Sequence, residues 1–464
     1  MENFGKRICQ TQVSSGIAAL SKKRGLLFQD GFDSKKLAAT LFKFFPKFRN
    51  RAYDPITTLF AFLSQVLSSD GSCKDAVARV NYERIARGEK PLSPDTGAYC
   101  KARDRLPEEW IHQLSQDCGK SMEEKVPEQW LWKDRHLKGV DGSTVLMADT
   151  PENQASYPQQ STQKKGVGFP ICRLVAVFSL ATGCLLDMAL GRYAGKQTGE
   201  HALLRQLFHC FDPGDIAVGD AYYAAYFLLA VFHGLNVDAV FRSDGKRNID
   251  FRKGIQLGKK DHQVIWNKPQ RPTWMDEETY QGMPEELVIR ECEVTVERPG
   301  FRTQTITLVT TILDPHYAPK EELGWIYWRR WHAEINLKAL KTTMKMEYVP
   351  CKTPEMVRKH IWATALAYNL IRKLIAESAH RYDALPTELS FKSTVQTLNQ
   401  YRPLWMDCDP EGARRVLDLL LDAISKSKVG NRPNRVEPRV VKRRPKPFRR
   451  LTVPRAQARA NLFK

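Results

Sequence analysis

The sequence predicts a mixed α/β fold with helices on the faces of a sheet, because three β-rich runs are followed by alternating helical and β patterns. The turn signal Thr182-Gly183 separates the second run from the third, so these two should pair as adjacent strands. The expected strands are Leu137–Met147, Leu174–Phe178, Cys184–Leu190, Ile216–Val218 and Val237–Phe241, and the expected helices between them are Glu200–Phe208 and Ala224–Gly234.

The rest of the chain divides by pattern. The N-terminal region has helical apolar spacing with Lys and Arg between, typical of a small DNA-contacting domain or of a solvated helical face. A β-rich stretch with a hairpin signal at Arg298-Pro299-Gly300 interrupts the sheet region, and helical pattern runs from Glu321 to about Ser378. The predicted parts are a helical N-terminal DNA-binding domain (1–130), the first part of the core (131–242), a β-rich insertion (243–311), the second part of the core (312–400), and a C-terminal helix with a basic tail (401–464).

The charge of the chain favours nucleic acid as a partner. The 464 residues are enough for two to four structural units, and the formal net charge is +20. A basic enzyme without such a partner, or one at a membrane surface, is the alternative. From Val429 to Lys464, twelve Lys and Arg against the single acid Glu437 leave +11, and five prolines oppose a long helix. This tail is expected to be extended and to order on DNA, or else to bind acidic partners nonspecifically.

Neither a secreted nor a membrane protein is expected. Ten cysteines contain no CxxC pair and fit neither a zinc site nor a disulfide framework, so a reducing cytoplasm is the simplest setting. Met1–Gln12 lacks the apolar run of a signal peptide. The most apolar stretch, Leu174–Leu190, is short and interrupted by Asp187, so it does not fit a bilayer span.

A polar ridge is predicted on the helix around Glu334. At about 100° per residue, Tyr327, Arg330, Glu334 and Lys341 fall within an arc of about 60°. A carboxylate flanked by cations suits a site that holds a metal ion and phosphates. The alternative is an exposed helix with ion pairs such as Glu334 with Lys338, and the helix alone favours that alternative. An apolar stripe beside the ridge consists of Ile326, Ala333, Leu337, Leu340 and Met344.

A metal site for phosphoryl transfer needs further carboxylates, and two candidates follow β-like runs. Asp141 lies in Gly139-Val140-Asp141-Gly142-Ser143, and Asp220 follows Ile216–Val218. Acids at strand ends can face a ligand, and Mg²⁺ prefers such hard oxygen donors. For either residue the alternative is a turn residue or a helix cap, and for an isolated Asp-Gly that alternative is clearly favoured.

The spacing Tyr327-x2-Arg330-x3-Glu334-x6-Lys341 resembles the signature of the IS-four family of bacterial insertion-sequence transposases. Further similar segments extend the resemblance over most of the chain, and it is strongest from about 137 to 345. These segments are Val140–Ser143, Asp149–Asn153, Gly166–Pro170, Arg173–Gly183 and Val218–Asp220.

The resemblance implies an RNase H-like core with a DDE triad of Asp141, Asp220 and Glu334 that binds two Mg²⁺ or Mn²⁺ ions. Asp220 and Glu334 are 114 positions apart, which leaves room for the β-rich insertion that such transposases carry. In the family, the Tyr, Arg and Lys of the signature contact DNA-end phosphates, roles that would fall to Tyr327, Arg330 and Lys341. Arg242 follows the strand after Asp220, where related enzymes place a phosphate-binding arginine.

The implied activity is that of a DNA transposase, which cuts insertion-sequence ends and joins their 3′-hydroxyls to target DNA. Its implied partners are double-stranded DNA with terminal inverted repeats, target DNA and a second copy of the chain, with Ala413–Ile424 as an amphipathic candidate for the interface. It would work in the bacterial cytoplasm, at the nucleoid. An RNase H-like nuclease without strand transfer, or an inactive or domesticated derivative, shares these features.

One part of the family pattern is missing. Related enzymes hold a flipped base against an aromatic residue of the insertion, but the corresponding strand, Thr305–Leu308, has no aromatic side chain. Trp266, Trp274 and Phe301 are the alternatives, although a packing role is favoured for each. The sequence therefore leaves a flipped base and a hairpin intermediate open.

Overall fold

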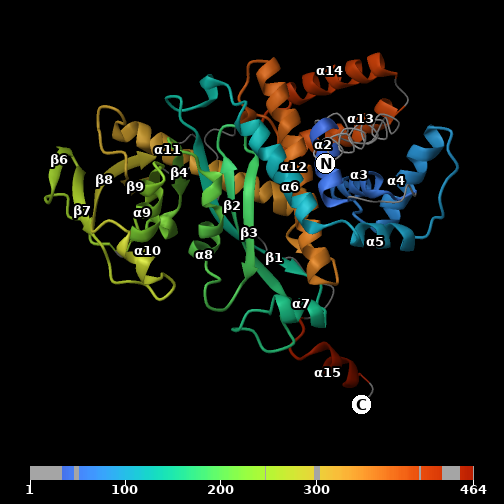
Figure 1. Cartoon of the computed structure of the whole chain (residues 1–464), viewed down its shortest axis with the longest axis horizontal. Helices are drawn as coiled ribbons and strands as arrows, with labels where there is room; N and C mark the ends of the chain where they lie inside the picture. The colour runs from blue at the N-terminus through green and yellow to red at the C-terminus, as the bar shows by residue number, and fades with distance from the viewer. Residues whose placement is uncertain are drawn as a thin grey trace, which may run out of the picture. The chain divides into compact units, whose positions relative to one another are not determined.

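The computed structural model describes residues 34–45, 52–245, 247–296, 304–406, 409–430 and 450–462. The chain forms two compact units, which are described separately (Figure 1). The helical unit comprises Met1–Val126, Thr182–Leu186 and Lys338–Val429. The sheet unit comprises Pro127–Ala181, Asp187–Leu337 and Gly430–Lys464. The domain boundaries expected at residues 130, 242, 311 and 400 stay predictions.

The sheet has the strand order β3-β2-β1-β4-β5-β9-β8-β7-β6. Strand β1 pairs with β2 in the antiparallel and with β4 in the parallel sense, and β4 is parallel to β5. This arrangement in β3-β2-β1-β4-β5 is that of an RNase H-like core, so the predicted fold class is confirmed. The core strands are β1 (Leu137–Met147), β2 (Ile171–Ser179), β3 (Leu185–Arg192), β4 (Ile216–Gly219) and β5 (Asp238–Arg242).

The β-rich insertion continues the core sheet. Strand β9 pairs antiparallel with β5, and Phe241 lies opposite Val309. The sequence did not predict β6 and β7, because their residues lack regular apolar alternation. Arg290 on β8 forms a buried ion pair with Asp261 on β7, with Nη2 2.6 Å from Oδ2. The predicted turn at Arg298-Pro299-Gly300 lies outside the described residues. The strands are β6 (Ile255–Gly258), β7 (Asp261–Asn267), β8 (Glu286–Val296) and β9 (Gln304–Thr310).

The helices of the sheet unit include α11, which carries the predicted ridge. Its first turn is fixed by Glu322, whose carboxylate accepts a hydrogen bond from Trp132 Nε1 at 3.0 Å and lies 2.9 Å from Lys133 Nζ. The helices and 3₁₀ turns are η2 (Glu128–Trp130), α7 (Pro151–Ser156), α8 (Glu200–Leu204), η3 (Arg205–Cys210), η4 (Ala221–Tyr223), α9 (Tyr226–Gly234), α10 (Glu277–Gln281), α11 (Lys320–Lys338) and α15 (Arg455–Ala460).

The helical unit packs around α12, whose middle residues are almost all buried. Asn369 on this helix donates to the carbonyl of Ser115 on α6 at 3.0 Å. Helices α3 and α4 lie in the N-terminal region that was predicted to be helical, and Asp54 caps α3 by accepting from Thr57 N. The helices of this unit are α2 (Ser34–Phe44), α3 (Pro55–Leu67), α4 (Cys73–Ala86), α5 (Gly97–Asp104), α6 (Glu108–Glu123), α12 (Pro354–Arg381), α13 (Phe391–Met406) and α14 (Pro410–Lys426).

The structure corrects two expectations in this unit. The helical pattern from Glu321 to Ser378 is broken, because α11 passes into the π-helical segment η5 (Ala339–Thr343), then the strand β10 (Tyr348–Val349), before α12 begins. Thr353 caps α12 and Pro354 occupies its first turn, so this sequence starts a helix rather than continuing one. The second correction concerns α14, the candidate dimer interface. Its apolar stripe is buried within the chain, including Val416, Leu420, Leu421 and Ile424.

Within the described ranges, the helices fall short of the length and apolar character needed to cross a membrane. The described cysteines are free thiols, and five of them are buried.

Candidate active site

The two predicted strand-end acids lie side by side in the sheet. Gly139 on β1 pairs with Val218 on β4 in the parallel ladder. Asp141 and Asp220 each follow two residues later, so they lie at the same level of adjacent strands. Residues at one level of parallel strands project from the same face of the sheet. The structure therefore brings these two carboxylates together.

Arg242 extends the same row by one strand. Val218 pairs with Val240 in the parallel β4–β5 ladder, so Arg242 lies level with Asp220. Its side chain is exposed at the end of β5. Its positive charge acts on the phenol of Tyr327, which links this strand end to α11.

Helix α11 packs closely on β1 just before Asp141. A Cβ atom added to Gly139 would lie 3.1 Å from Cβ of Ala333, so a glycine allows this close approach. Arg329 anchors the same helix by donating from Nη2 to the carbonyl of Leu180 at 2.7 Å. Glu334 follows Ala333 directly, and the glycine contact therefore sets its distance from β1.

The three predicted acids form one electrostatic cluster. The pKa of Asp141 is raised to about 7, chiefly by burial, and the negative charges of Glu334 and Asp220 act in the same direction. The guanidinium of Arg330 and the backbone N–H of Gly142 act in the opposite direction, since both stabilise the Asp141 carboxylate. Without a bound cation, Asp141 therefore keeps its proton to a higher pH than an ordinary carboxyl group.

Arg330 lies at the centre of this cluster. Its Nη2 is 2.6 Å from Oε1 of Glu334, and its guanidinium lies 5.5 Å from the ring centre of Tyr327. Among the described residues its buried Nε has no hydrogen-bond partner, so this donor is unsatisfied. Burial raises the pKa of Tyr327, so this phenol stays protonated and can donate a hydrogen bond.

Lys341 belongs to a different part of the structure. It lies in the π-helical segment η5 of the helical unit, beyond the end of α11. A π-helical turn changes the angle between successive residues, so the extrapolation of a regular helix to Lys341 was wrong. Its contact with DNA stays a prediction.

The donor set fits a divalent cation of the Mg²⁺ type. Asp141, Asp220 and Glu334 offer hard carboxylate oxygens on three different elements. Burial is the main cause of the raised pKa of Asp141, and repulsion from the other two carboxylates adds to it. A divalent cation bound among them would relieve that repulsion.

A second set of metal-ligating side chains has another explanation. Asp187, His209 and Cys210 lie close enough to share an ion. His209 Nε2 is 3.0 Å from Asp187 Oδ2, and this carboxylate raises the pKa of His209, so the two form an ordinary ion pair. Burial raises the pKa of the Cys210 thiol, which disfavours the thiolate that a metal requires.

The aromatic candidates for a flipped base are accounted for by packing where they are described. Trp266 is buried, donates from Nε1 to Glu291 at 3.0 Å and has Arg247 3.4 Å from its ring centre. Trp274 has Arg205 3.8 Å from its ring centre. Phe301 lies outside the described residues.

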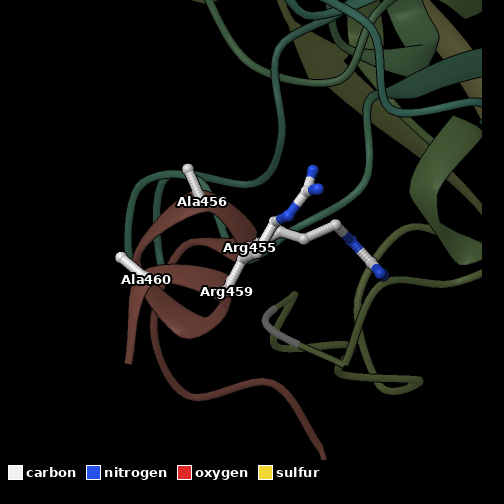
Figure 2. A pocket seen from close by; sticks show the side chains of 4 residues that line it. All are labelled: Arg455, Ala456, Arg459 and Ala460. Atoms are coloured by element: carbon white, nitrogen blue, oxygen red, sulfur yellow. The ribbon is translucent and has the colours of Figure 1, made fainter. Parts of the chain in front are cut away.

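A surface pocket at α15 lacks the chemistry for a metal. Arg455 and Arg459 extend from one side of this short helix, and two alanines lie on the other (Figure 2). The four residues offer positive charge and no carboxylate.

The RNase H-like core and its acidic cluster define a metal-dependent enzyme of nucleic acids. The transposase DDE domain family matches residues 136–370, about half of the chain. The chain is also 28% identical over 372 residues to the transposase InsG for insertion sequence element IS4 from Escherichia coli (strain K12), covering 77% of this chain and 78% of that protein. The chain therefore belongs to the DDE transposases of the IS4 family.

One solved structure matches the chain weakly. The piggyBac transposase, in a synaptic complex with hairpin DNA, matches with a TM-score of 0.41 and 10% identity over 86% of this chain and 84% of that one. This weak likeness does not bear on the site.

Three residues near the cluster carry no signal in the sequence. Arg329 lies between Tyr327 and Arg330 but is not one of the four signature residues, and its anchoring contact depends on the turn after β2. Glu200 and Tyr223 lie in short helical segments and show no spacing pattern that singles them out.

Proposed function

We propose that this transposase cuts at the ends of an insertion sequence and joins the freed 3′-hydroxyls to target DNA, with Asp141, Asp220 and Glu334 as its catalytic residues. The observation that carries the proposal is that the charges of Asp220 and Glu334 both act on Asp141, with Arg330 beside Asp141 and Glu334. Family membership supports a divalent metal and DNA as the substrate. The proposal adds two ions, Mg²⁺ or Mn²⁺, held by the three carboxylates.

Bound ions would supply Lewis-acid activation of the attacking and leaving oxygens. The chain itself orients the carboxylates: the β1–β4 register fixes Asp141 beside Asp220, and the packing of Ala333 on Gly139 fixes Glu334. Asp141 loses its proton as a cation binds, because the cation favours the carboxylate form.

Three further residues hold the DNA backbone in this proposal. Arg330 donates from its unpaired Nε to a phosphate of the DNA end, and the protonated phenol of Tyr327 donates beside it. Arg242 lies level with Asp220 and adds a positive charge at the end of β5. Lys341 of the signature completes the set, by resemblance to the family.

Two ends must be joined in one event, so we propose that two copies of the chain assemble on DNA that carries terminal inverted repeats. The basic C-terminal tail supports binding to DNA phosphates. It contributes affinity rather than sequence selection, because phosphate contacts carry no sequence information directly.

Strand transfer with pre-cut ends tests the proposal. The substrate is an end fragment with an exposed 3′-hydroxyl, mixed with supercoiled target plasmid, full-length protein and Mg²⁺. Joined products are expected from the wild type and should be absent with Asp141→Ala, whereas Glu278→Ala, an exposed residue of α10, should join normally. Cleavage of uncut ends without any joining of pre-cut ends would instead identify a nuclease and refute the proposal.

A further inference from the structure

A fourth carboxylate, Glu200, lies against the strand that carries Asp141. A Cβ atom added to Gly142 would lie 2.4 Å from Cδ of Glu200 and 2.5 and 2.6 Å from its two oxygens. Only a glycine therefore allows the carboxylate to rest on β1 at this point. Gly142 directly follows Asp141, so Glu200 packs on the backbone that orients that residue.

The same carboxylate reaches the segment that follows Asp220. Tyr223 in η4 is fully buried and donates from its hydroxyl to Oε2 of Glu200 at 3.1 Å. The backbone N–H of Tyr222 donates to Oδ1 of Asp220 at 2.8 Å. The first turn of η4 thus fixes the Asp220 side chain, and Glu200 holds the end of that turn.

Neighbouring contacts hold α8 in place. Nε2 of His201 lies 2.5 Å from the carbonyl oxygen of Tyr222, and the ring centres of His201 and Tyr222 are 4.3 Å apart. Arg173 on β2 donates to the carbonyl of Thr198, just before α8, at 2.8 Å. Glu200 is therefore attached to a fixed helix start, and its contacts connect β1 with η4.

The pKa of the Tyr223 phenol also indicates that Glu200, Asp141 and Asp220 lie close to it. The charges of Glu200, Asp141 and Asp220 all act on it, and together with burial they raise its pKa well above the usual value. The hydroxyl consequently remains a donor, and it donates to Oε2 of Glu200.

We propose that Glu200 is a positioning residue of the transposase: through Gly142 and Tyr223 it fixes the separation of Asp141 and Asp220, and thereby sets the affinity of the site for divalent cations. The inference rests on the proposed metal-binding role of those two acids. Glu200 acts here through hydrogen bonding and packing, and it does not itself bind the cation. Residues that orient metal ligands typically change metal affinity by about 10- to 100-fold when they are replaced.

Four variants of the full-length protein separate the two roles that Glu200 can have. Glu200→Ala removes both contacts, and Tyr223→Phe removes only the hydrogen bond. Glu200→Gln keeps an acceptor for Tyr223 but loses the charge. Gly142→Ala introduces the Cβ atom that displaces the carboxylate. Glu278→Ala removes an exposed acid of α10 and serves as the matched control.

Two quantities are measured for each variant: binding of Mn²⁺ alone, followed by the signal of free Mn²⁺ in electron paramagnetic resonance, and the Mn²⁺ dependence of end cleavage. We expect Glu200→Ala, Tyr223→Phe and Gly142→Ala to weaken Mn²⁺ binding about tenfold. Glu200→Gln and the control should stay within about threefold of the wild type. Cleavage at saturating Mn²⁺ should recover most of its rate in all four variants.

Two results would overturn the inference. Wild-type Mn²⁺ affinity in Glu200→Ala would remove any role for this residue at the site. Equal losses in Glu200→Gln and Glu200→Ala, with Tyr223→Phe unaffected, would show that the charge binds the cation directly. If the proposed function itself is wrong, Asp141→Asn will change neither Mn²⁺ binding nor the Mn²⁺ dependence of cleavage. That outcome distinguishes its failure from a failure of the inference about Glu200.

Discussion

Asp141 and Asp220 lie at the same level of two adjacent parallel strands, because Gly139 pairs with Val218 two residues before each of them. This register makes the pair of acids a property of the sheet rather than of flexible loops. Asp220→Asn should therefore reduce end cleavage by at least about 10³-fold without changing the fold. End binding should stay within a few-fold of the wild type in a gel-shift assay. Cleavage at a wild-type rate would remove Asp220 from the catalytic set.

Arg330 is expected to bind DNA as well as to pair with Glu334. Charge-assisted hydrogen bonds contribute about 1.5–3 kcal/mol, so Arg330→Gln should weaken binding of the DNA end by about tenfold or more. Arg330→Lys should fall between, because lysine keeps the charge but lacks the planar fork of donors. Binding of DNA ends by fluorescence anisotropy checks this order. Lysine and glutamine variants of equal affinity would contradict it.

The metal-free protein should lose stability as the pH rises from about 4 to 7. Burial raises the pKa of Asp141 from 3.8 to about 7, so the folded state holds a proton that the unfolded state releases. Stability from this group is present at low pH and is lost as the pH rises through that window. Urea unfolding in EDTA should show this loss in the wild type, and Asp141→Asn should reduce the slope. An identical slope in both proteins would show that Asp141 has an ordinary pKa.

The contact between Gly139 and Ala333 predicts that a substitution outside the three acids can reduce DNA cleavage. Gly139→Val should press α11 away from β1, because even a Cβ atom would lie 3.1 Å from Ala333 and 2.6 Å from Leu180. Overpacking of this kind costs about 1–3 kcal/mol. The rate of DNA cleavage should fall along with the stability, because Glu334 moves when α11 is displaced. Gly97→Ala in α5, which meets no atom within 4 Å, is the matched control. Unfolding curves that do not distinguish the two variants would refute the contact.

The basic tail should control the salt dependence of DNA binding. Residues after Gly430 hold the twelve cations counted in the sequence, and each phosphate contact contributes about 0.9 to the slope of log affinity against log salt on duplex DNA. Deletion of residues 431–464 should reduce that slope by several units. Filter binding from low to high salt measures it. A slope equal to that of the full chain would mean that the tail makes no phosphate contacts.

The sheet and its acids were predictable because they depend on local patterns. The apolar runs ending at Asp220 and containing Asp141 define strands whatever surrounds them, and the observed β1 has the predicted bounds, Leu137–Met147. The fixed spacing from Tyr327 to Glu334 lies within one regular helix, so its angular positions could be calculated.

What the sequence could not predict depends on contacts between distant segments. The carboxylate of Glu200 reaches the site only because Gly142 leaves room for it, and no local pattern records that contact. The register between β5 and β9 joins the insertion to the core sheet, and it too depends on long-range pairing. Lys341 lies within a π-helical turn that the neighbouring residues do not indicate, so the position calculated from a regular helix was wrong.

The most direct test of the central claim is cleavage of DNA that carries an insertion-sequence end by Glu334→Ala in the presence of Mg²⁺. Glu334 is the acid that α11 brings to the two strand-end carboxylates. The variant should bind the end about as well as the wild type and should leave it uncut, with no rescue when Mn²⁺ replaces Mg²⁺. Cleavage by Glu334→Ala at the wild-type rate would contradict the assignment of Asp141, Asp220 and Glu334 as the catalytic triad.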